Sequence, residues 1–369
     1  MNLFLFGTLR DDALREIVIG RAVGGRAARL AGHGVRRAAE GDHPVIGAGE
    51  GAEGLLVEGL GTEEASRLDY YEGAFGCRRH PVRVTTQAGE IAAQVYAAEP
   101  DSASDAAWDL SEWQSEWAPL VRKTAEQAMA LYGQGDSATL ARRLPMMRVR
   151  ASSALRAAEC PAPRHIRADL TRDDVTVETA RRPYVNFFAL DEYDLEHPHF
   201  DGGRSGTLNR AGLVSGDAVT VLPYDPARDR VLVIEQFRFG PFSRGDLRPW
   251  CLEPVAGRVD PGEAPETAAR REAEEEARLD VGALWTVASY YPSPGVLTEY
   301  LWSYVGVCDL PDGAETLAGK ADEGEDIRTH VLSFDRLMEL ITAGEVDTAP
   351  LLLTAFWLAR ARAEGLPAA

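Results

Sequence analysis

The sequence predicts an α/β protein in which a small β-rich domain, a helical stretch and a larger α/β domain follow one another. Three observations support this prediction. Short apolar segments alternate with glycine-rich turns over residues 1–98, helical periodicity dominates residues 99–163, and strand-like and helix-like segments interleave over residues 164–369. Interleaved strands and helices are typical of an α/β sandwich.

The first domain is expected to consist mainly of short strands. Residues 2–6 form an apolar run that stops at Gly7, which is typical of a buried strand entering a tight turn. Similar segments, separated by glycine-rich turns, recur at residues 54–57, 82–85 and 91–96. We expect few helices in this part of the chain.

A helical stretch is expected next. Over residues 101–132, apolar residues recur at three- and four-residue steps, which predicts an amphipathic helix. A second helix, rich in alanine and arginine, is expected up to about residue 158, with an interruption at Pro145. The two prolines of Cys160–Pro163 cannot continue a helix, so they predict a domain boundary.

Strands and helices alternate in the last part. The turn at residues 225–229 is expected to join strands 218–224 and 230–237 into a hairpin. The other expected elements are strands at residues 187–195, 300–308 and 329–334 and helices at residues 265–278 and 350–363.

The composition limits the classes of function. The chain has 58 acidic and 39 basic residues and a formal net charge of -19, which argues against a protein that binds nucleic acid or anionic membranes. The cysteines are scattered without paired spacing, which fits reduced thiols in a cytoplasm better than disulfides or a zinc site. The N-terminus lacks signal-peptide features, and no apolar run is as long as a membrane span. We expect a soluble cytoplasmic protein.

A glutamate-rich helix carries the clearest functional signal. Glu272 and Glu276 are one helical turn apart and share a face, and Glu275 lies three residues after Glu272. Like charges at these spacings repel, by roughly 0.2–0.5 kcal/mol a pair. A divalent cation such as Mg²⁺ would remove this repulsion and could bridge to substrate phosphates. The alternative is a solvated run of charges on a surface helix.

The frame around these glutamates resembles the signature of the Nudix hydrolases. In that signature a glycine, five residues, Glu, seven residues, Arg-Glu, two residues and Glu-Glu follow in order. The matching residues here are Gly257, Glu263, Arg271, Glu272, Glu275 and Glu276. Arg278 stands where the family usually has the glycine that closes the helix, so the way this helix ends stays open.

The resemblance implies a role for each matching position. Glu272 and Glu276 are the implied main ligands of Mg²⁺ or Mn²⁺, and Glu275 is the implied catalytic residue that supports a second metal ion. The carbonyl of Ala256 would complete the site. Glu263 and Arg271 would orient the carboxylates.

The flanks of the signature resemble the ADP-ribose pyrophosphatase branch of the family. The segments that carry this resemblance are residues 233–238, 252–257, 293–295 with Glu299, and 321–327, and Pro294 matches the usual marker of the branch. The resemblance implies cleavage of ADP-ribose to AMP and ribose 5-phosphate by a homodimer. Related enzymes that act on GDP-mannose share much of this pattern, so GDP-mannose or another nucleoside diphosphate sugar is the alternative substrate.

The same branch implies a catalytic base and substrate contacts outside the helix. Glu323 matches the base on a loop that closes over the diphosphate, and Glu325 is the second choice. The acids of this loop could instead serve only solubility. Arg238, and more weakly Arg210, would bind ribose or phosphate. Phe187 matches an aromatic that stacks on adenine, although an aromatic in a strand is as often part of a core.

The N-terminal domain resembles the gamma-glutamylcyclotransferase-like (AIG2-like) fold, a small β-barrel-like domain. Residues 6–10, Phe-Gly-Thr-Leu-Arg, resemble its first motif, YGTL. Residues 68–73 followed by Arg78-Arg79 resemble the second motif, LDxYEG. No nucleic acid or membrane partner is implied.

These two motifs suggest a cyclisation reaction. The backbone N–H groups of Gly7, Thr8 and Leu9 would hold anionic oxygens of a substrate, and Glu72 would take a proton from an amine that attacks its own γ-carbonyl. Phe6 replaces the tyrosine of the motif and removes its hydroxyl group. The alternative is therefore a scaffold or regulatory domain with a vestigial pocket.

The helical stretch between the domains is locally basic. Its arginines are expected to form a solvated face that pairs with acidic neighbours; they are Arg142, Arg143, Arg148, Arg150 and Arg156. The two-domain layout resembles bacterial proteins linked to tellurite resistance, which suggests a phenotype without a mechanism.

Three functions from different classes are open at this point. The chain could be a metal-dependent ADP-ribose diphosphatase, a nucleotide-sensing module that regulates its N-terminal domain, or an amine-releasing cyclotransferase with an accessory C-terminal half. The intact set of glutamates favours the diphosphatase, since a family member that no longer hydrolyses its substrate is expected to have lost at least one of them.

Overall fold

The computed structural model describes residues 1–39, 43–98, 103–159, 163, 165–319 and 325–367. It divides into two compact units, Met1–Pro161 and Ala162–Ala369, and each is described here by itself. None of the helices in these ranges combines the length and hydropathy that a crossing of the bilayer requires.

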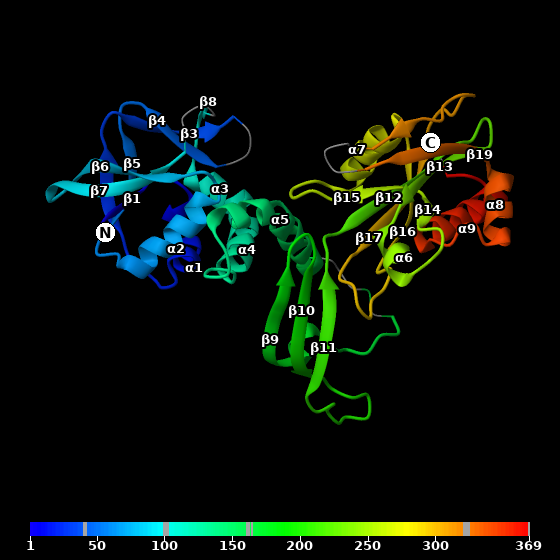
Figure 1. Cartoon of the computed structure of the whole chain (residues 1–369), viewed down its shortest axis with the longest axis horizontal. Coiled ribbons are helices and arrows are strands. Elements are labelled where there is room, and N and C mark those ends of the chain that lie inside the picture. Colours follow the sequence, from blue (N-terminus) through cyan, green and yellow to red (C-terminus); the bar gives the residue numbers. More distant parts are fainter. Residues whose placement is uncertain (40–42, 99–102, 160–162, 164, 320–324, 368–369) are drawn as a thin grey trace. The chain divides into compact units, whose positions relative to one another are not determined.

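The N-terminal unit is built on a closed five-stranded barrel (Figure 1). Its strands, in the order in which they pair, are β1 (Leu3–Leu5), β5 (Ala52–Val57), β2 (Arg26–Leu30), β6 (Arg78–Thr86) and β7 (Gly89–Ala97). The barrel closes where Leu3 lies opposite Gln94 in a parallel pair. Phe4, Leu56 and Val84 belong to its apolar core. The prediction of a small β-barrel-like domain is confirmed.

A second sheet and several helices surround the barrel. The sheet contains β4 (Pro44–Ala48), β3 (His33–Ala38) and β8 (Ala103–Ala107). The helices are η1 (Thr8–Arg10), a single 3-10 turn, and α1 (Asp12–Ile19), α2 (Thr62–Gly73), α3 (Leu110–Glu116), α4 (Ala118–Met129) and α5 (Ser137–Glu159).

Asp11 ties these helices together. Its carboxylate caps α1 by accepting the N–H of Leu14 at 2.9 Å, and it also accepts from Gln114 of α3 at 2.7 Å and from Arg122 of α4 at 2.9 Å. Only 2% of Asp11 is exposed, and a buried carboxylate is tolerated when it is paired and hydrogen-bonded. Burial raises its pKa, but the bonds to Arg122, Leu14 and Gln114 lower it more, so the pKa is lower than usual.

The prediction of one helix over residues 101–132 is wrong in its first part. Residues Ala103–Ala107 form β8, which pairs with β3, because the backbone finds partners in a neighbouring strand there. Asp109 then starts α3 by accepting two backbone N–H groups of its first turn. The pattern breaks again at Trp117, between α3 and α4.

The predicted interruption at Pro145 is also wrong, because α5 continues through it. Proline removes one hydrogen bond of the helix. The side chain of Pro145 is exposed, however, whereas Leu144 and Met147 on either side are buried, 7% and 0% exposed. Burial of the flanking residues outweighs the lost bond.

The C-terminal unit contains two sheets. A three-stranded sheet has the order β11 (Leu208–Val214), β10 (Ala189–Glu196) and β9 (Thr176–Val185) and follows the 3-10 turn η2 (Arg172–Asp174). The described strands of the larger sheet are β16 (Leu284–Tyr290), β17 (Leu301–Val307), β12 (Ala218–Asp225), β13 (Arg230–Phe237), β19 (Ile327–Ser333) and β18 (Leu317–Ala318), with β14 (Trp250–Glu253) paired to β13 and β15 (Val255–Arg258) paired to β12.

The two central strands of the larger sheet separate along their length. β12 and β13 pair only at Tyr224 and Asp225, next to the turn that joins them. Farther along, β12 pairs with β15 and β13 pairs with β14. The consecutive strands β14 and β15 thus occupy the opening, and the glutamate helix α7 (Pro265–Ala277) follows directly after it.

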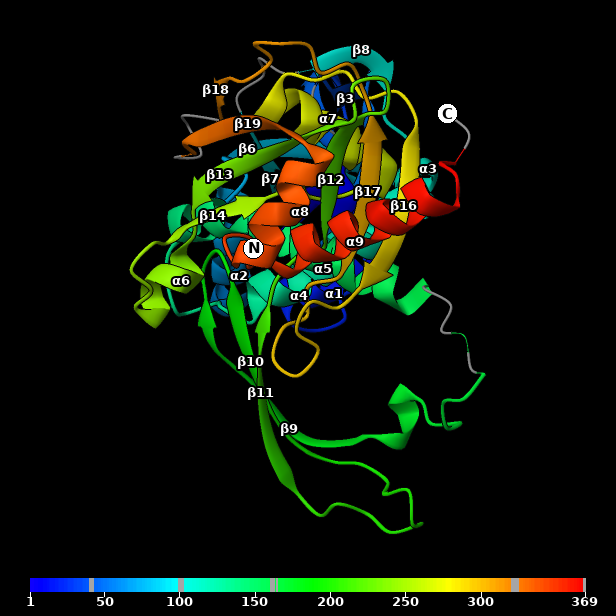
Figure 2. The ribbon, with the colours of Figure 1, turned by 90° about the vertical axis from the view of Figure 1, so that its right-hand side faces the viewer.

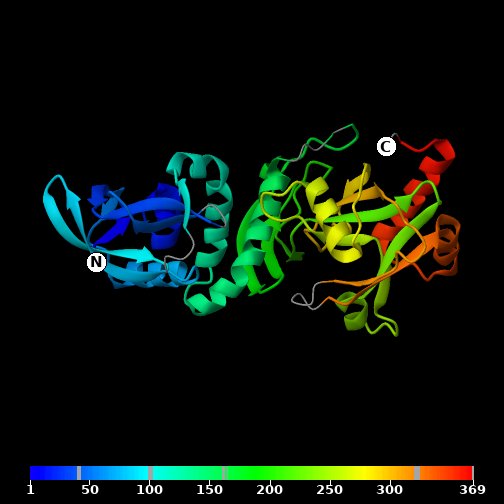
Figure 3. The ribbon, with the colours of Figure 1, turned by 90° about the horizontal axis from the view of Figure 1, so that it is seen from above.

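Helices cover both faces of this sheet. α7 lies on one face, and α8 (Phe334–Ala343) and α9 (Ala349–Glu364) lie on the other (Figures 1 and 3). Figure 2 looks onto α8 and α9 with the strands behind them. Consecutive residues of β12 point to opposite faces: Val221 packs with Ala268 of α7, whereas Leu222 packs with Leu337 and Leu358.

The prediction of an α/β/α sandwich is confirmed. The expected strands and helices of this unit correspond to β10, β12, β13, β17, β19, α7 and α9. Sequence patterns do not reveal β9, β11, β14, β15, β16, β18, α8 or the short α6 (Phe239–Arg244).

Arg278 ends the glutamate helix in the conformation that a glycine usually adopts. Its φ is 54°, in the left-handed region, and its N–H donates to the carbonyl of Glu274 at 3.0 Å. The N–H of Leu279 donates to the carbonyl of Ala273 at 3.1 Å, which completes a C-terminal cap. The cap is therefore formed without glycine, at the steric cost that an L-residue pays in this region.

Replacing Arg278 with glycine is expected to raise the free energy of unfolding by about 1 kcal/mol, because glycine has no Cβ to clash in the left-handed region. Urea denaturation of the full chain measures this change. Glu274→Gly, at an exposed position with regular helical backbone in α7, is the control and is expected to lose about 1 kcal/mol. A loss of stability in both variants would contradict the cap described above.

Candidate functional site

The glutamate helix is held tightly against the sheet by small side chains. The residues of α7 that face the strands are fully or almost fully buried, and they are Ala268, Ala269, Ala273 and Ala277. Alanine allows a close approach of helix and strand, so the acidic face is fixed relative to β15. Pro265 begins the helix at its first turn, as the sequence predicts.

Gly257 lets the carboxylate of Glu272 lie on the backbone of β15. A Cβ atom added to Gly257 would be 1.8 Å from Cδ of Glu272 and 1.9 Å from its Oε1, closer than any non-bonded atoms can approach. The glycine of the signature is therefore required by space, and its partner is the first glutamate of the expected metal site.

Arg271 gathers the surrounding carboxylates. Its Nε and Nη2 donate to the two oxygens of Glu263, both at 3.0 Å. Its Nη1 donates to Glu272 at 2.7 Å and to Glu275 at 3.1 Å, and Nη2 also donates to the carbonyl of Arg258 at 2.9 Å. The hydrogen bonds to Glu263 and the neighbouring carboxylates raise the pKa of Arg271 further above its usual value. This arrangement can fix the orientation of Glu272 and Glu275.

Glu276 is the most buried of the glutamates, with 3% of its surface exposed. Its Oε2 accepts the N–H of Ala256 at 3.0 Å. Burial raises the pKa of Glu276 to about 8; the bond from Ala256 lowers it, and the negative charges of Glu272 and Glu325 raise it further. The carboxylates of Glu272 and Glu325 thus lie close enough to Glu276 to act on its charge.

This donor set fits a hard divalent cation. Carboxylate oxygens around a backbone carbonyl are the ligands that Mg²⁺ prefers, and a cation would offset the repulsion that raises the pKa of Glu276. In the described ranges, no three His, Cys, Asp or Glu side chains are gathered closely enough to enclose an ion by themselves. Glu272 and Glu275 are directed to Arg271 instead.

Arg238 lies at the edge of the same group. Its Nε donates to Glu253 at 2.6 Å, and its charge lowers the pKa values of both Glu276 and Glu299. Burial raises the pKa of Glu253 above its usual value even though Arg238 opposes this. The side chain is 40% exposed, so it can also contact a ligand.

Phe187 lies next to Arg258, the residue after Gly257. The guanidinium carbon of Arg258 is 4.2 Å from the centre of the Phe187 ring, a cation–π contact. The ring is 49% exposed and is thus not part of a core. Arg258 also lowers the pKa of Glu299, which burial raises.

Two predicted site residues are not brought to this group by the described structure. Arg210 lies on β11, where it donates to the carbonyl of Asn209 at 3.0 Å, and no hydrogen bond or ion pair joins it to the carboxylates of α7. Glu323 lies outside the described residues. Glu325, the second choice for the base, is described and half-buried, and it lies near Glu276.

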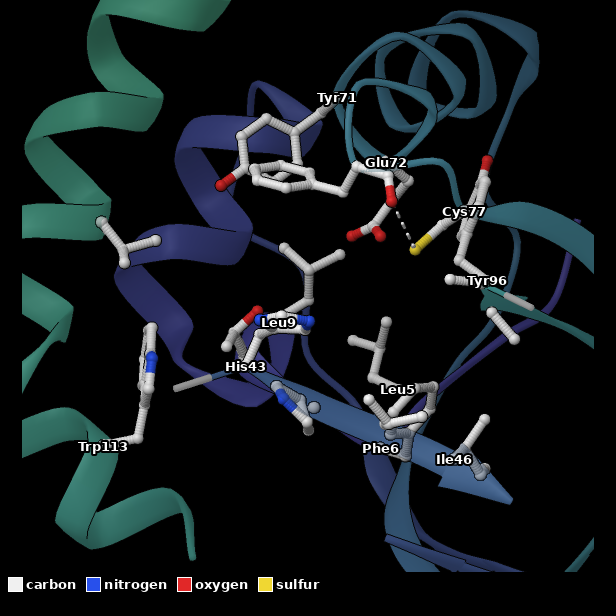
Figure 4. A pocket seen from close by; sticks show the side chains of 18 of the residues that line it. Leu5, Phe6, Leu9, His43, Ile46, Tyr71, Glu72, Cys77, Tyr96 and Trp113 are labelled. Carbon is white, nitrogen blue, oxygen red and sulfur yellow. Dashed lines mark hydrogen bonds between the residues drawn. The ribbon is translucent and has the colours of Figure 1, made fainter. Parts of the chain in front are cut away.

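The N-terminal unit contains a cavity of about 590 Å³. Its lining includes the turn Gly7–Leu9, Glu72 and Cys77 (Figure 4). Figure 4 shows the Glu72 carboxylate pointing into the cavity beside Cys77 and Tyr96, with Trp113 on the opposite side. The predicted residues of both motifs are therefore brought to one cavity.

Glu72 has the electrostatic character of a proton acceptor near neutral pH. Burial raises its pKa to about 7, and the hydrogen bond from the Cys77 thiol lowers it only in part. Burial and the negative charge of Glu72 raise the pKa of Cys77 to about 12, so its thiol stays protonated. Asp69 of the same motif accepts from Tyr96 at 2.7 Å and from Arg79 at 2.8 Å, which connects α2 to β7 and β6.

Comparison with known families identifies the C-terminal unit. Residues 214–353 match the model of the NUDIX domain. An ADP-ribose pyrophosphatase of Escherichia coli K12 is 38% identical over 187 residues, which cover 51% of this chain and 88% of that protein. The chain belongs to the Nudix family. It is a Nudix hydrolase, and the resemblance of its flanks to the ADP-ribose pyrophosphatase branch is confirmed.

Two further relatives share this part of the Nudix hydrolase. An ADP-ribose pyrophosphatase of Haemophilus influenzae is 34% identical over 190 residues, 51% of this chain and 87% of the relative. A GDP-mannose pyrophosphatase of Enterobacter is 31% identical over 170 residues, 46% of this chain and 86% of the relative. Residues 3–115 match the model of gamma-glutamyl cyclotransferase, AIG2-like, which confirms the family of the N-terminal domain.

Sequence reasoning gives no site role to Arg258 or Glu299, which the structure places near the candidate site. Arg258 follows the signature glycine directly, and this position was the available signal. Glu299 is one of the residues that carry the resemblance to the ADP-ribose pyrophosphatase branch, and the fold places it just before β17, where Arg238 and Arg258 lower its pKa.

Gly257→Ala is expected to reduce nucleotide hydrolysis at least about 100-fold, because the new methyl group displaces the Glu272 carboxylate and a misplaced catalytic group costs about this factor. The rate at saturating Mg²⁺ measures the loss. Gly240→Ala in the same unit, where an added Cβ meets nothing within 4 Å, is the control and should keep the wild-type rate. An unchanged rate in Gly257→Ala would show that hydrolysis does not depend on the described position of the Glu272 carboxylate.

Proposed function

We propose that this Nudix hydrolase cleaves the diphosphate bond of ADP-ribose and yields AMP and ribose 5-phosphate. The observation that carries the proposal is the placement of Glu272 against Gly257 and of Glu276 against Ala256, in a unit that is 38% identical to an ADP-ribose pyrophosphatase. GDP-mannose is the alternative substrate, because a GDP-mannose pyrophosphatase is 31% identical.

Glu272, Glu276 and Glu275, with the carbonyl of Ala256, would hold Mg²⁺ or Mn²⁺. The bound ion would offset the charge of the diphosphate and polarise the phosphorus. Arg271 would keep Glu272 and Glu275 in position, and Glu263 would in turn hold Arg271 through its two hydrogen bonds.

A carboxylate is needed to take a proton from the attacking water. We assign this role to Glu323, with Glu325 as the second choice. The position of Glu325 near Glu276 supports this part of the chain as the source of the base. A base acts when it comes within hydrogen-bond reach of the water, which loop closure would provide.

The polar edge of the site would bind the rest of the substrate. Arg238, already held by Glu253, has the forked donors that suit a phosphate or ribose group. The exposed ring of Phe187 would stack on adenine, and Arg258 beneath it would add positive charge. Arg210 is proposed as a further substrate contact.

We also propose a cytoplasmic homodimer. The exposed Val177 and Tyr184 on β9 of the three-stranded sheet, 48% and 54% exposed, support an interface there. The link to tellurite resistance rests only on the two-domain layout.

Glu276→Gln tests the diphosphatase. We expect the wild type with Mg²⁺ to release AMP from ADP-ribose faster than GMP from GDP-mannose, and the variant to lose at least about 100-fold of the rate. Omitting Mg²⁺ should have the same effect as the substitution. Arg336→Gln on α8, an exposed residue that pairs with Glu339, is the control.

If the wild type is inactive on both substrates and on dinucleotides, the enzyme proposal fails. Binding of ADP-ribose without turnover would then favour the nucleotide-sensing function.

The cavity of the N-terminal unit supports a second function, an amine-releasing cyclotransferase. The α-amino nitrogen of a γ-glutamyl amide attacks the γ-carbonyl carbon, the ring C–N bond forms, and the bond to the leaving amine breaks. Glu72 takes a proton from the α-amine and returns it to the leaving amine, so 5-oxoproline and a free amine are produced. The supporting observation is the placement of Glu72 in the cavity with a pKa raised to about 7.

The pH profile tests this function. A base works only when deprotonated, so 5-oxoproline release should rise with pH and level off above about 7, the pKa of Glu72. Glu72→Gln should abolish release at every pH, while Glu63→Gln, at the exposed start of α2, should not. Release that is independent of Glu72 would contradict the role of this residue.

A further inference from the structure

The N-terminal cavity has a second wall that the barrel does not supply. The lining residues from the helices after the barrel are Trp113, Trp117, Val121, Thr124, Leu144 and Arg148. All of them except Trp113 lie beyond residue 115, where the match to the cyclotransferase family ends. The ligand contacts that these helices provide are therefore specific to this chain and are not part of the matched domain.

Arg148 lines the cavity without a partner. It is half-buried on α5, and it makes no hydrogen bond or ion pair with any described residue. Arg142 of the same helix, by contrast, donates to Thr139 at 3.0 Å.

The sequence-based expectation of a solvated face that pairs with acids is wrong for Arg150, which is 3% exposed and donates to Gln127 at 3.3 Å. It does not hold for Arg148 either, which pairs with no described acid. The charge of Arg148 lowers the pKa of Tyr71, which neighbours Glu72, although burial raises that pKa overall.

The rest of the cavity is largely apolar. Phe6 and Phe75 line it from the barrel side, and Val121 and Leu144 line it from α4 and α5. A ligand that complements this lining has a large apolar group and an anionic hydrogen-bond acceptor. A carboxylate suits the forked donors of one guanidinium, whereas a phosphate dianion would be left with a single cation and would face the Glu72 carboxylate in the same cavity.

We propose that Arg148 forms a carboxylate-binding subsite in the N-terminal cavity, which accepts a ligand that joins a large apolar group to a carboxylate. The ligand class rests on the cyclotransferase function proposed above. In that reaction the leaving amine is an α-amino acid with an aromatic or branched side chain. Its side chain packs on the wall formed by α4 and α5, and its carboxylate binds Arg148.

A pair of matched ligands tests the subsite. γ-Glutamylphenylalanine and γ-glutamylphenethylamine differ only in the carboxylate of the second residue. Calorimetric titration uses the full chain with Glu72→Gln, in which turnover is blocked. We expect the acid to bind roughly 10- to 100-fold more tightly than the amine, the range that a charge-assisted hydrogen bond provides.

The substitution Arg148→Met, added to Glu72→Gln, should abolish this preference and leave the affinity for the amine unchanged. Arg142→Met on the same helix is the matched control and should keep the full preference, because Arg142 is exposed and does not line the cavity.

Equal affinity for the two ligands, binding of neither, or a preference that survives Arg148→Met would overturn the subsite. Release of 5-oxoproline by the chain with Glu72 intact is measured separately. A carboxylate preference without any 5-oxoproline would refute the cyclotransferase function and leave the subsite standing.

Discussion

The contact between Gly257 and Glu272 is the constraint on which the C-terminal unit depends. The carboxylate occupies the space that a Cβ atom at position 257 would need, so glycine allows α7 and β15 to approach closely. The alanines of α7 allow the same close approach along the rest of the helix. In this arrangement Glu276 is buried and accepts the N–H of Ala256, and burial raises its pKa. The close packing of α7 on β15 therefore also positions the carboxylates of the candidate site.

The two units solve the problem of a buried acid in different ways. In the C-terminal unit, Arg271 collects several carboxylates and leaves Glu276 with a raised pKa. In the N-terminal unit, Asp11 is fully paired and has a lowered pKa, whereas Glu72 has a thiol as its partner and a pKa of about 7. Asp11 thus holds helices together, whereas Glu72 and Glu276, whose pKa values burial raises, lie in the two candidate sites.

The sequence was most informative where spacing alone defines the geometry. The positions of Glu272, Glu275 and Glu276 follow from helical periodicity, and Gly257 follows from the signature. Elements that depend on contacts with residues distant in sequence were not predictable. β8 forms by pairing with β3, and α5 continues through Pro145 because Leu144 and Met147 on either side are buried. The contact of Arg258 with Phe187 joins two sheets and has no local signal.

The network around Asp11 determines where the N-terminal domain can be cut. Arg122 and Gln114, which satisfy this carboxylate, come from the helices after the barrel. A fragment that ends near residue 98 would keep the barrel strands but leave Asp11 without these partners and open one side of the cavity to water. The independently folding piece is therefore expected to extend through α5, and a boundary drawn at the end of the last barrel strand would divide a single cooperative unit.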